Sequence, residues 1–252
     1  ADALDAIAAT ATGGFRVAPG ISVKLSALHP RYEWSHAEEA KAAILPVLQD
    51  LVARAAKADI HLTIDAEEAD RLELSMDLIE AIVSDDRLFA NDWGGFGLAI
   101  QAYAKRAVPT VDWAIELARK HGRKLMVRLV KGAYWDSEIK LAQVAGLPDY
   151  PVFTRKVATD VSYLACAKRL LAASDCIYPA FATHNANTIG AVKALAGDVK
   201  FEFQRLHGMG EGLYEELSRL ERGLGEEPTP VRLYAPVGSH KELLAYLVRR
   251  LL

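Results

Sequence analysis

The chain has 252 residues, of which 51% are hydrophobic, so it is long enough to bury one large core. Its formal net charge of −3 at pH 7 excludes the strongly basic surface that is typical of nucleic-acid-binding domains. Two isolated cysteines, no apolar run near the about 18 residues of a membrane span and no signal peptide predict a cytoplasmic protein without disulfides.

Short apolar, β-branched runs alternate with longer amphipathic stretches along the chain. The runs predict strands at 21–25, 61–66, 96–103, 124–132, 178–184, 199–205 and 231–237. The stretches between them predict helices at 37–57, 110–121, 153–173, 188–196 and 213–222. Repeated βα units predict an α/β fold with a parallel sheet, and their number favours a (β/α)8 TIM-like barrel, which typically needs about 250 residues.

The predicted barrel has seven strands rather than eight, and the first residues are already helix-patterned. We therefore expect the barrel to be incomplete at the N-terminus, with a strand missing upstream of Ala1. A doubly wound open sheet is the alternative, but the glycines at 94–97 and 208–212 lack the GxGxxG spacing of that fold. No linker or internal repeat divides the sequence, so residues 1–252 are predicted to form a single domain.

Each predicted strand carries a polar residue near its carboxyl end, where sites in barrels of this kind lie. These residues are Lys24, Asp65, Gln101, Arg128, His184, Gln204 and Tyr234. One such residue is an ordinary strand terminus, but one on every strand predicts a polar-walled pocket. Because buried charge is costly unless it is paired, we expect Lys24 and Asp65 to neutralise one another across adjacent strands.

The pocket shows no nucleophile motif such as GxSxG, and the seven histidines lack metal-ligand spacing, so no metal is expected. An organic cofactor that carries phosphate suits such a site better. Two loops favour this interpretation: one holds Lys131, Gly132, Ala133, Tyr134 and Trp135, and the other holds Thr154, Arg155 and Lys156. Glycine permits close backbone approach, aromatic rings can stack, and cations at a helix start attract phosphate, although solvated basic residues are equally common there.

A capping box at 239–242 predicts a last helix that runs to the chain end. Leucines and a valine form one face of this helix, and Tyr246, Arg249 and Arg250 fall on the opposite face. The polar face is either ordinary solvated surface or a clamp in which two guanidinium groups hold one carboxylate. The pattern alone leaves both interpretations open.

Five longer stretches resemble the proline dehydrogenase domain of proline utilization A, a bifunctional proline dehydrogenase and pyrroline-5-carboxylate dehydrogenase family. They are 21–32 (ISVKLSALHPRY), 128–136 (RLVKGAYWD), 181–186 (FATHNA), 203–210 (FQRLHGMG), and 234–238 (YAPVG) with 246–251 (YLVRRL). The resemblance runs in order from about residue 20 to the last residue. Motifs of this length make chance agreement negligible.

The resemblance implies a distorted (β/α)8 barrel with a C-terminal helix covering the active site. It also implies a noncovalently bound FAD and oxidation of L-proline to Δ1-pyrroline-5-carboxylate. In that reaction a hydride passes from proline C5 to flavin N5, and the electrons then reach a membrane quinone. A cytoplasmic protein with at most peripheral contact to the inner face of the membrane is therefore expected.

The resemblance also implies roles for individual residues. Arg249 and Arg250, with Lys24 as a third cation, would hold the carboxylate of proline or of its analogues, and Asp65 would position Lys24. The walls around the pyrrolidine ring would be Tyr134, Leu206, Tyr234 and Tyr246. The flavin contacts would be Gln101, Arg128, Val130, Lys131, Gly132, Ala133, Trp135, Thr154, Arg155, Lys156, Thr183, His184, Asn185 and Gln204.

The chain departs from the family at both ends. In the family the last helix continues with ENGAN beyond two leucines, and a strand carrying DMLGE precedes the first helix; here the sequence starts at Ala1 and stops at Leu252. We expect a fragment or minimal form of one domain, without the DNA-binding and aldehyde dehydrogenase domains. The competing interpretations are another flavin barrel, such as a methylenetetrahydrofolate reductase-like enzyme, and a catalytically idle domain kept for regulation or assembly.

Overall fold

The computed structural model describes residues 2–238, in which seven strands form one parallel sheet. The strands follow one another in chain order across the sheet, and each pairs in parallel with the next. They are β1 (Ile21–Val23), β2 (Leu62–Ile64), β3 (Phe96–Gln101), β4 (Leu125–Val130), β5 (Ile177–Ala182), β6 (Glu202–Leu206) and β7 (Val231–Tyr234). The predicted strands and their parallel arrangement are confirmed, and most observed strands are shorter because their predicted ends form loops.

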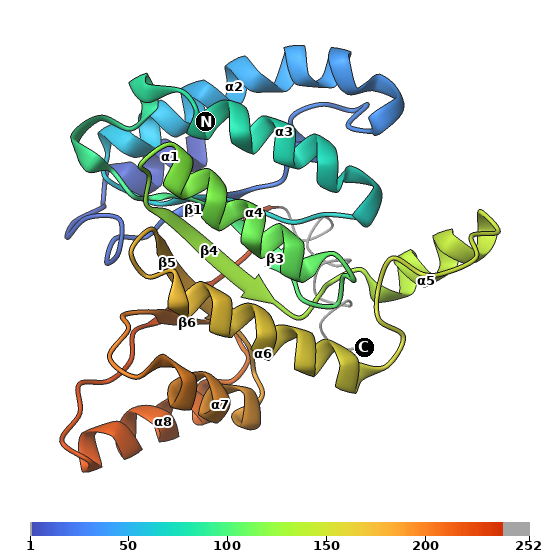
Figure 1. Ribbon diagram of the computed structural model, residues 1–252. Coiled ribbons are helices and arrows are strands. Elements are labelled where there is room, and N and C mark those ends of the chain that lie inside the picture. The colour runs from blue at the N-terminus through green and yellow to red at the C-terminus, as the bar shows by residue number, and fades with distance from the viewer. Residues whose placement is uncertain (1, 239–252) are drawn as a thin grey trace.

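Helices lie before and between the strands, and most of them pack on the outer side of the sheet (Figure 1). They are α1 (Asp2–Ala8), α2 (Ala37–Lys57), α3 (Leu72–Val83), α4 (Ala107–Lys120), α5 (Trp135–Val144), α6 (Lys156–Ala172), α7 (Ala186–Ala196) and α8 (Glu211–Gly223). The five predicted helical stretches are confirmed, with ends that differ by a few residues. Helix α5 starts inside the segment that was predicted as a loop, and it projects away from the body of the molecule (Figure 1).

Alternation along each strand separates an apolar face from a polar one. In β4, Leu125, Val127 and Leu129 are fully buried and belong to the main core under the helices. Arg128 lies on the opposite face of the same strand and contacts side chains from β1 and β6. The outward face therefore builds the hydrophobic core, and the inward face carries the polar groups.

The sheet curls so that strands far apart in its order approach one another. Arg128 of β4 donates to the Ser22 hydroxyl of β1 at 2.6 Å, and the Tyr234 hydroxyl of β7 donates to Asp65 at 3.2 Å. Arg232 of β7 donates to the Ala18 carbonyl, just before β1, at 2.8 Å. The observed fold is thus a curled parallel α/β sheet. Among residues 2–238 no eighth strand joins it, and the predicted helix at 239–252 lies outside the described residues.

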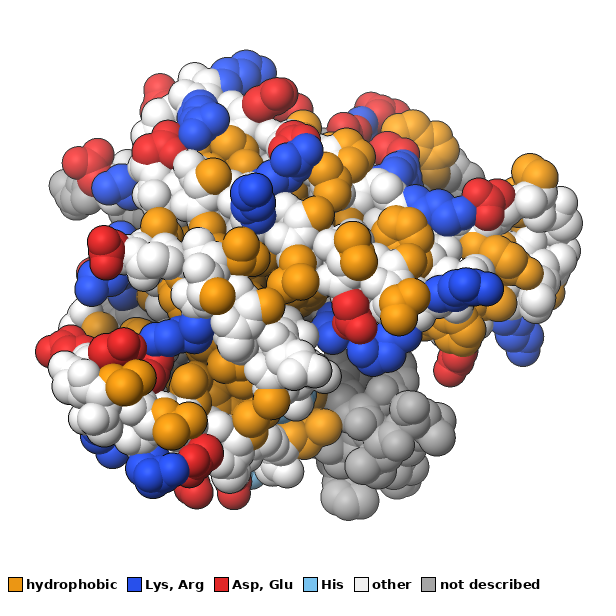
Figure 2. All heavy atoms as spheres, turned by 60° about the horizontal axis from the view of Figure 1, so that its bottom comes forward, with side chains coloured by type: hydrophobic (Ala, Val, Ile, Leu, Met, Phe, Trp, Pro, Cys, Tyr) orange, Lys and Arg blue, Asp and Glu red, His pale blue; other side chains and the backbone are white. Residues whose placement is uncertain are grey.

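Both cysteines are free, as predicted, and both are buried. No helix among residues 2–238 combines the length and the apolar character needed to cross a membrane. Over the same residues, no group of three or more His, Cys, Asp or Glu side chains is placed to hold a metal ion. Figure 2 shows acidic and basic side chains interspersed over one face of the molecule, with apolar side chains between them.

Candidate active site

A cavity of about 490 Å³ opens at the carboxyl ends of the strands. It brings together most of the residues that the sequence predicted for the site. Its lining includes Lys24, Asp65, Gln101, Arg128, Val130, Lys131, Gly132, Ala133, Tyr134, Lys156, Thr183, His184, Asn185, Gln204, Leu206 and Tyr234. Strand ends that are far apart in the sequence converge here because the parallel sheet places all carboxyl ends at one edge.

A second hollow of about 360 Å³ adjoins this cavity and shares Lys131, Gly132 and Lys156 with it. Trp135 and Thr154 line this second hollow rather than the first. Arg155, just before α6, is exposed and lines neither, so its role stays a prediction. The remaining predicted site residues, Tyr246, Arg249 and Arg250, lie outside the described residues.

Asp65 is the centre of the charge cluster in the cavity. Its carboxylate accepts from Lys24 Nζ at 2.7 Å and from Arg128 Nη1 at 2.7 Å, which confirms the expected Lys24–Asp65 pair. Burial alone would raise the pKa of Asp65, but Arg128 and Lys24 outweigh it and hold that pKa below its usual range. For Lys24, burial opposes and Asp65 supports the charged form, and the net effect raises its pKa. Both groups are therefore charged near neutral pH.

Arg128 is 7% exposed and is fixed on several sides. Besides Asp65, it donates through Nε to Gln204 Oε1 at 2.8 Å and through Nη2 to Ser22 at 2.6 Å. The Tyr234 ring lies against its guanidinium, with 4.9 Å between Cζ and the ring centroid. Arg128 thus donates from Nε, Nη1 and Nη2 to described residues and also lines the cavity.

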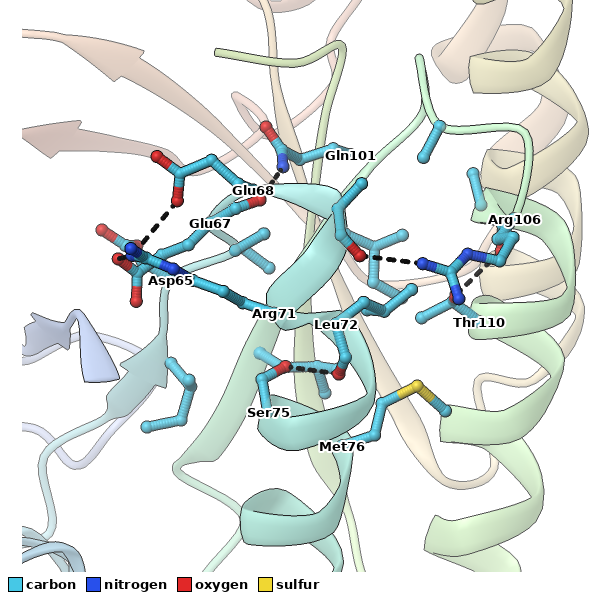
Figure 3. Close-up of a pocket in the computed structure, with 18 of the residues that line it drawn as sticks. Asp65, Glu67, Glu68, Arg71, Leu72, Ser75, Met76, Gln101, Arg106 and Thr110 are labelled. Atoms are coloured by element: carbon cyan, nitrogen blue, oxygen red, sulfur yellow. Dashed lines mark hydrogen bonds and ion pairs between the residues drawn. The ribbon is translucent and has the colours of Figure 1, made fainter. Parts of the chain in front are cut away.

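Gln101 connects the loops after three strands. Its amide nitrogen donates to the Glu67 carbonyl at 2.8 Å, and its amide oxygen accepts from the Ala133 N–H at 3.0 Å. The Glu67 carboxylate in turn accepts from the Ser26 N–H at 3.0 Å. Figure 3 shows Gln101 above a smaller cavity of about 50 Å³, which lies on the outer side of the sheet against α3 and α4. Gln101 thus holds the rim of the large cavity rather than pointing freely into it.

The loop after β4 requires a glycine at position 132. Gly132 has φ +153°, a conformation that favours glycine, and a Cβ there would lie 2.3 Å from the Tyr103 ring. Trp135 donates from its indole nitrogen to the Phe153 carbonyl at 2.9 Å, which joins this loop to the segment before α6. The glycine thus lets the backbone pass close to a protein ring, and its predicted approach to a cofactor stays a prediction.

Two lysines flank the passage between the two hollows, and they share one carboxylate that the sequence prediction missed. Asp160 accepts from Lys131 Nζ at 2.5 Å and from Lys156 Nζ at 2.7 Å. Hydrogen bonds from Lys131 and then Lys156 lower the pKa of Asp160. One net positive charge therefore remains at the passage, which suits an anionic group. The i, i+4 spacing of Lys156 and Asp160 on a helix was the available signal.

His184 is held in one protonation state. Its Nε2 accepts from the Leu206 N–H at 3.0 Å, so the ring proton is assigned to Nδ1. Burial and then the nearby Arg205 lower its pKa, which keeps the imidazole neutral near pH 7. The neighbouring Asn185 caps α7 by accepting from the Thr188 N–H at 2.9 Å.

Two further residues on the inward face, Glu202 and Arg232, were also missed. Glu202 is 1% exposed and accepts from Arg232 Nε at 2.8 Å. The alternation of glutamate and glutamine with phenylalanines at 201–204 was the available signal, because it places Glu202 on the same face as Gln204.

The two connected hollows suit an extended organic group that carries phosphate. The inner hollow presents Arg128 and Lys24 around a cluster of polar strand ends, and the passage presents Lys131 and Lys156. Arginine and lysine donors match anionic oxygens. The donor set of the described residues therefore fits an organic cofactor that carries phosphate.

The chain was compared with known proteins. The sequence model of the family described as "Proline dehydrogenase" matches residues 1–252. A curated relative, "Bifunctional protein PutA" of Salmonella typhimurium, is 54% identical over 255 residues, which cover 99% of this chain and 19% of the relative. The chain thus spans about a fifth of that relative's length.

Solved structures agree with this match. A crystal structure of proline utilization A from Bradyrhizobium japonicum superposes with a TM-score of 0.92 at 55% identity, covering 99% of this chain and 25% of that one. A structure of proline utilization A with proline bound in remote sites gives a TM-score of 0.93 with the same identity and coverage. The curled sheet is therefore shared with those structures over nearly the whole chain.

Proposed function

Because the chain belongs to the proline dehydrogenase family, we propose that it oxidises L-proline to Δ1-pyrroline-5-carboxylate with a noncovalently bound FAD. The observation that carries the proposal is the cavity at the strand ends, in which Lys24, Asp65 and Arg128 form one partly buried charge cluster. We further propose a quinone as the final electron acceptor, peripheral contact with a membrane, and one domain over residues 1–252.

The described residues divide naturally between the parts of the cofactor. When bound, FAD would accept a hydride from proline C5 and later give up the electrons to the quinone. Arg128 would stabilise negative charge on the reduced ring, since it is a cation in the lining of the cavity. The passage with Lys131 and Lys156 would hold the phosphates, and the hollow with Trp135 and Thr154 would hold the remainder.

Proline would be held mainly by position and charge. Lys24 supplies a cation for the substrate carboxylate, and Arg249 and Arg250 are proposed to add two more. The ring walls would be Tyr134, Leu206 and Tyr234, which line the cavity, together with Tyr246. Transfer of the hydride requires the amine to be neutral, and no described residue stands out as its base. Positioning is then the chain's main contribution to the rate.

Spectroscopy of the purified chain tests this proposal. We expect a yellow protein that releases FAD on mild denaturation and whose visible absorbance is bleached by L-proline without oxygen. Lys24→Met should keep the FAD and weaken L-proline binding by about tenfold or more, since a hydrogen bond to a charged group is worth about 1.5–3 kcal/mol. The matched control is Lys57→Met at the exposed end of α2.

Three outcomes separate the proposal from its alternatives. A colourless protein that gains no absorbance on addition of FAD would contradict the flavin site. Bound flavin that L-proline does not bleach would favour a catalytically idle domain. Bleaching by a reduced nicotinamide, but not by L-proline, would favour a different flavin-dependent reductase.

A further inference from the structure

Below the cavity floor, a buried carboxylate lies one layer deeper than the proposed flavin contacts. Glu202 of β6 is 1% exposed and is absent from the lining of the large cavity. Its Oε1 accepts from Gln204 Nε2 at 2.7 Å and from Arg232 Nε at 2.8 Å, and its Oε2 accepts from Arg232 Nη2 at 2.9 Å. Glu202 therefore touches a lining residue without touching the cavity itself.

The Gln204 amide lies between two groups of opposite hydrogen-bonding character. On one side Glu202 is a carboxylate that only accepts, and on the other Arg128 is a guanidinium that only donates. An amide in this place has one satisfied orientation, with its nitrogen toward Glu202 and its oxygen toward Arg128. The reversed orientation would set donor against donor and acceptor against acceptor in a buried site, where unpaired polar groups are costly.

We propose that Glu202 is a positioning residue. It fixes the rotation of the Gln204 amide and thereby the position of the Arg128 guanidinium beside the cofactor. This inference rests on the proposed function, because Arg128 is a flavin contact only there. The other two acceptors of Arg128 are Ser22 on β1 and Asp65 just after β2, and they accept from its Nη atoms. Its Nε donates to Gln204. Nε therefore depends on the orientation of that amide.

Glu202 also has a structural role that must be separated from positioning. Its partner Arg232 donates to the carbonyls of Ala18 at 2.8 Å and Arg16 at 2.7 Å, so the pair ties β7 to the segment before β1. Any variant that breaks this tie destabilises the fold. The test therefore needs a property of the flavin that stability alone does not move.

Two substitutions in the complete chain separate the roles. Glu202→Met keeps the length of the side chain but removes both acceptor oxygens, so Gln204 Nε2 and Arg232 each lose their carboxylate partner. Arg232→Lys keeps a cation beside Glu202 and loses the fork to the two backbone carbonyls. Both should lower the thermal midpoint. Only Glu202→Met should weaken FAD binding, by about tenfold or more, and shift the flavin midpoint potential to more negative values as the Arg128 guanidinium is displaced.

A double-mutant cycle then tests the route through Gln204. In a Gln204→Met background the amide is gone, so adding Glu202→Met should change the FAD dissociation constant by less than about twofold. Glu202→Asp, which keeps the charge but withdraws it from Gln204, serves as the second variant in case Glu202→Met does not fold. It should show the same change in FAD binding and potential.

Unchanged FAD binding and potential in both Glu202 variants would overturn the inference. So would equal changes in Arg232→Lys, or a full additional loss in the Gln204→Met background. Measurements on the parent protein distinguish failure of this inference from failure of the proposed function. If the parent binds no FAD, the proposed function fails; if it binds FAD that L-proline bleaches and the Glu202 variants match it, only the positioning role fails.

Discussion

The two faces of the curled sheet are both largely buried near its strands, but they are packed by different kinds of contact. On the outward face, Phe181 and Phe203 are fully buried among other aromatic rings and aliphatic side chains. On the inward face, Arg128 and Gln204 are also buried, but each meets specific polar partners. Apolar contacts are non-directional, whereas each inward group depends on the identity and orientation of its neighbour.

The voids on the two faces differ accordingly. The outward side leaves a cavity of about 50 Å³ between the sheet and α3 and α4, and Figure 3 draws its lining. The inward side opens into a cavity of about 490 Å³. Close packing on one side supplies stability, and the open polar side supplies the site. We therefore expect substitutions on the outward face to change the free energy of unfolding most, and substitutions at the site to change ligand binding more than stability.

The largest effect is expected on the outward face. Phe181→Ala removes a ring that contacts Tyr163 and Phe201, with centroid distances of 6.5 and 5.5 Å. We expect a loss of about 3–5 kcal/mol in the free energy of unfolding, because the truncation leaves a cavity in the core. Denaturant unfolding measures it. FAD affinity per folded molecule should stay near that of the parent.

The control for this prediction is Val161→Ala on the exposed side of α6, where the valine is 69% exposed. Its effect should stay within about 0.5 kcal/mol. A small loss in Phe181→Ala, or a loss of FAD affinity as large as that of stability, would remove the distinction between the two faces.

A smaller effect is expected at the edge of the site. Gly132→Ala places a Cβ against the Tyr103 ring in a backbone conformation that alanine rarely adopts. We expect about 1–3 kcal/mol of destabilisation, together with weaker FAD binding as the loop shifts. Gly212→Ala in α8 is the matched control, since nothing lies within 4 Å of its added Cβ. There, alanine should stabilise the helix slightly; equal outcomes at both glycines would mean that the Gly132 loop yields without strain.

The sequence predicted the outward face better than the inward one, and the reason is physical. Apolar periodicity is local, so the strands and helices could be predicted from short windows. The pairing of Lys24 with Asp65 followed from charge and strand adjacency. Glu202 and Arg232 lie on adjacent strands but 30 residues apart, and each looks like an ordinary surface residue in the sequence. Contacts such as that of Arg128 with Ser22 form only when the sheet curls, because β4 and β1 are not neighbours in it.

Helix α5 shows a second limit of local patterns. The stretch that was predicted as a cofactor loop continues into a helix, whose Glu138 is buried and accepts from the Ala69 N–H at 2.7 Å. This long-range contact joins α5 to the loop after β2. No periodicity in the sequence marks it, since the partner is a backbone group.

The smallest expected effect comes from comparing two carboxylates, the partly buried Asp65 and the buried Glu138. Asp65, on the inward face, has two cations on its oxygens and a lowered pKa. Glu138 lies outside that face, and burial raises its pKa from the usual 4.5. The hydrogen bond from the Ala69 N–H and the charge of Arg106 lower this pKa, whereas the charges of Asp70 and Glu68 raise it further. A paired carboxylate stabilises the fold in its charged form, and a desolvated one in its neutral form.

Glu138→Gln should therefore change the pH dependence of stability. As pH rises from about 4.5 through the raised pKa of the folded state, the unfolded parent loses its proton first, so its free energy of unfolding falls. Glutamine cannot lose a proton and can still accept from Ala69, so the free energy of unfolding of the variant should rise relative to that of the parent between about pH 4 and pH 8. Urea unfolding at both pH values measures the gain. Glu216→Gln, at an exposed residue whose pKa Arg219 lowers, should show no such gain. A pH-independent difference for Glu138→Gln would mean that its carboxylate is as well solvated in the folded chain as in the unfolded one.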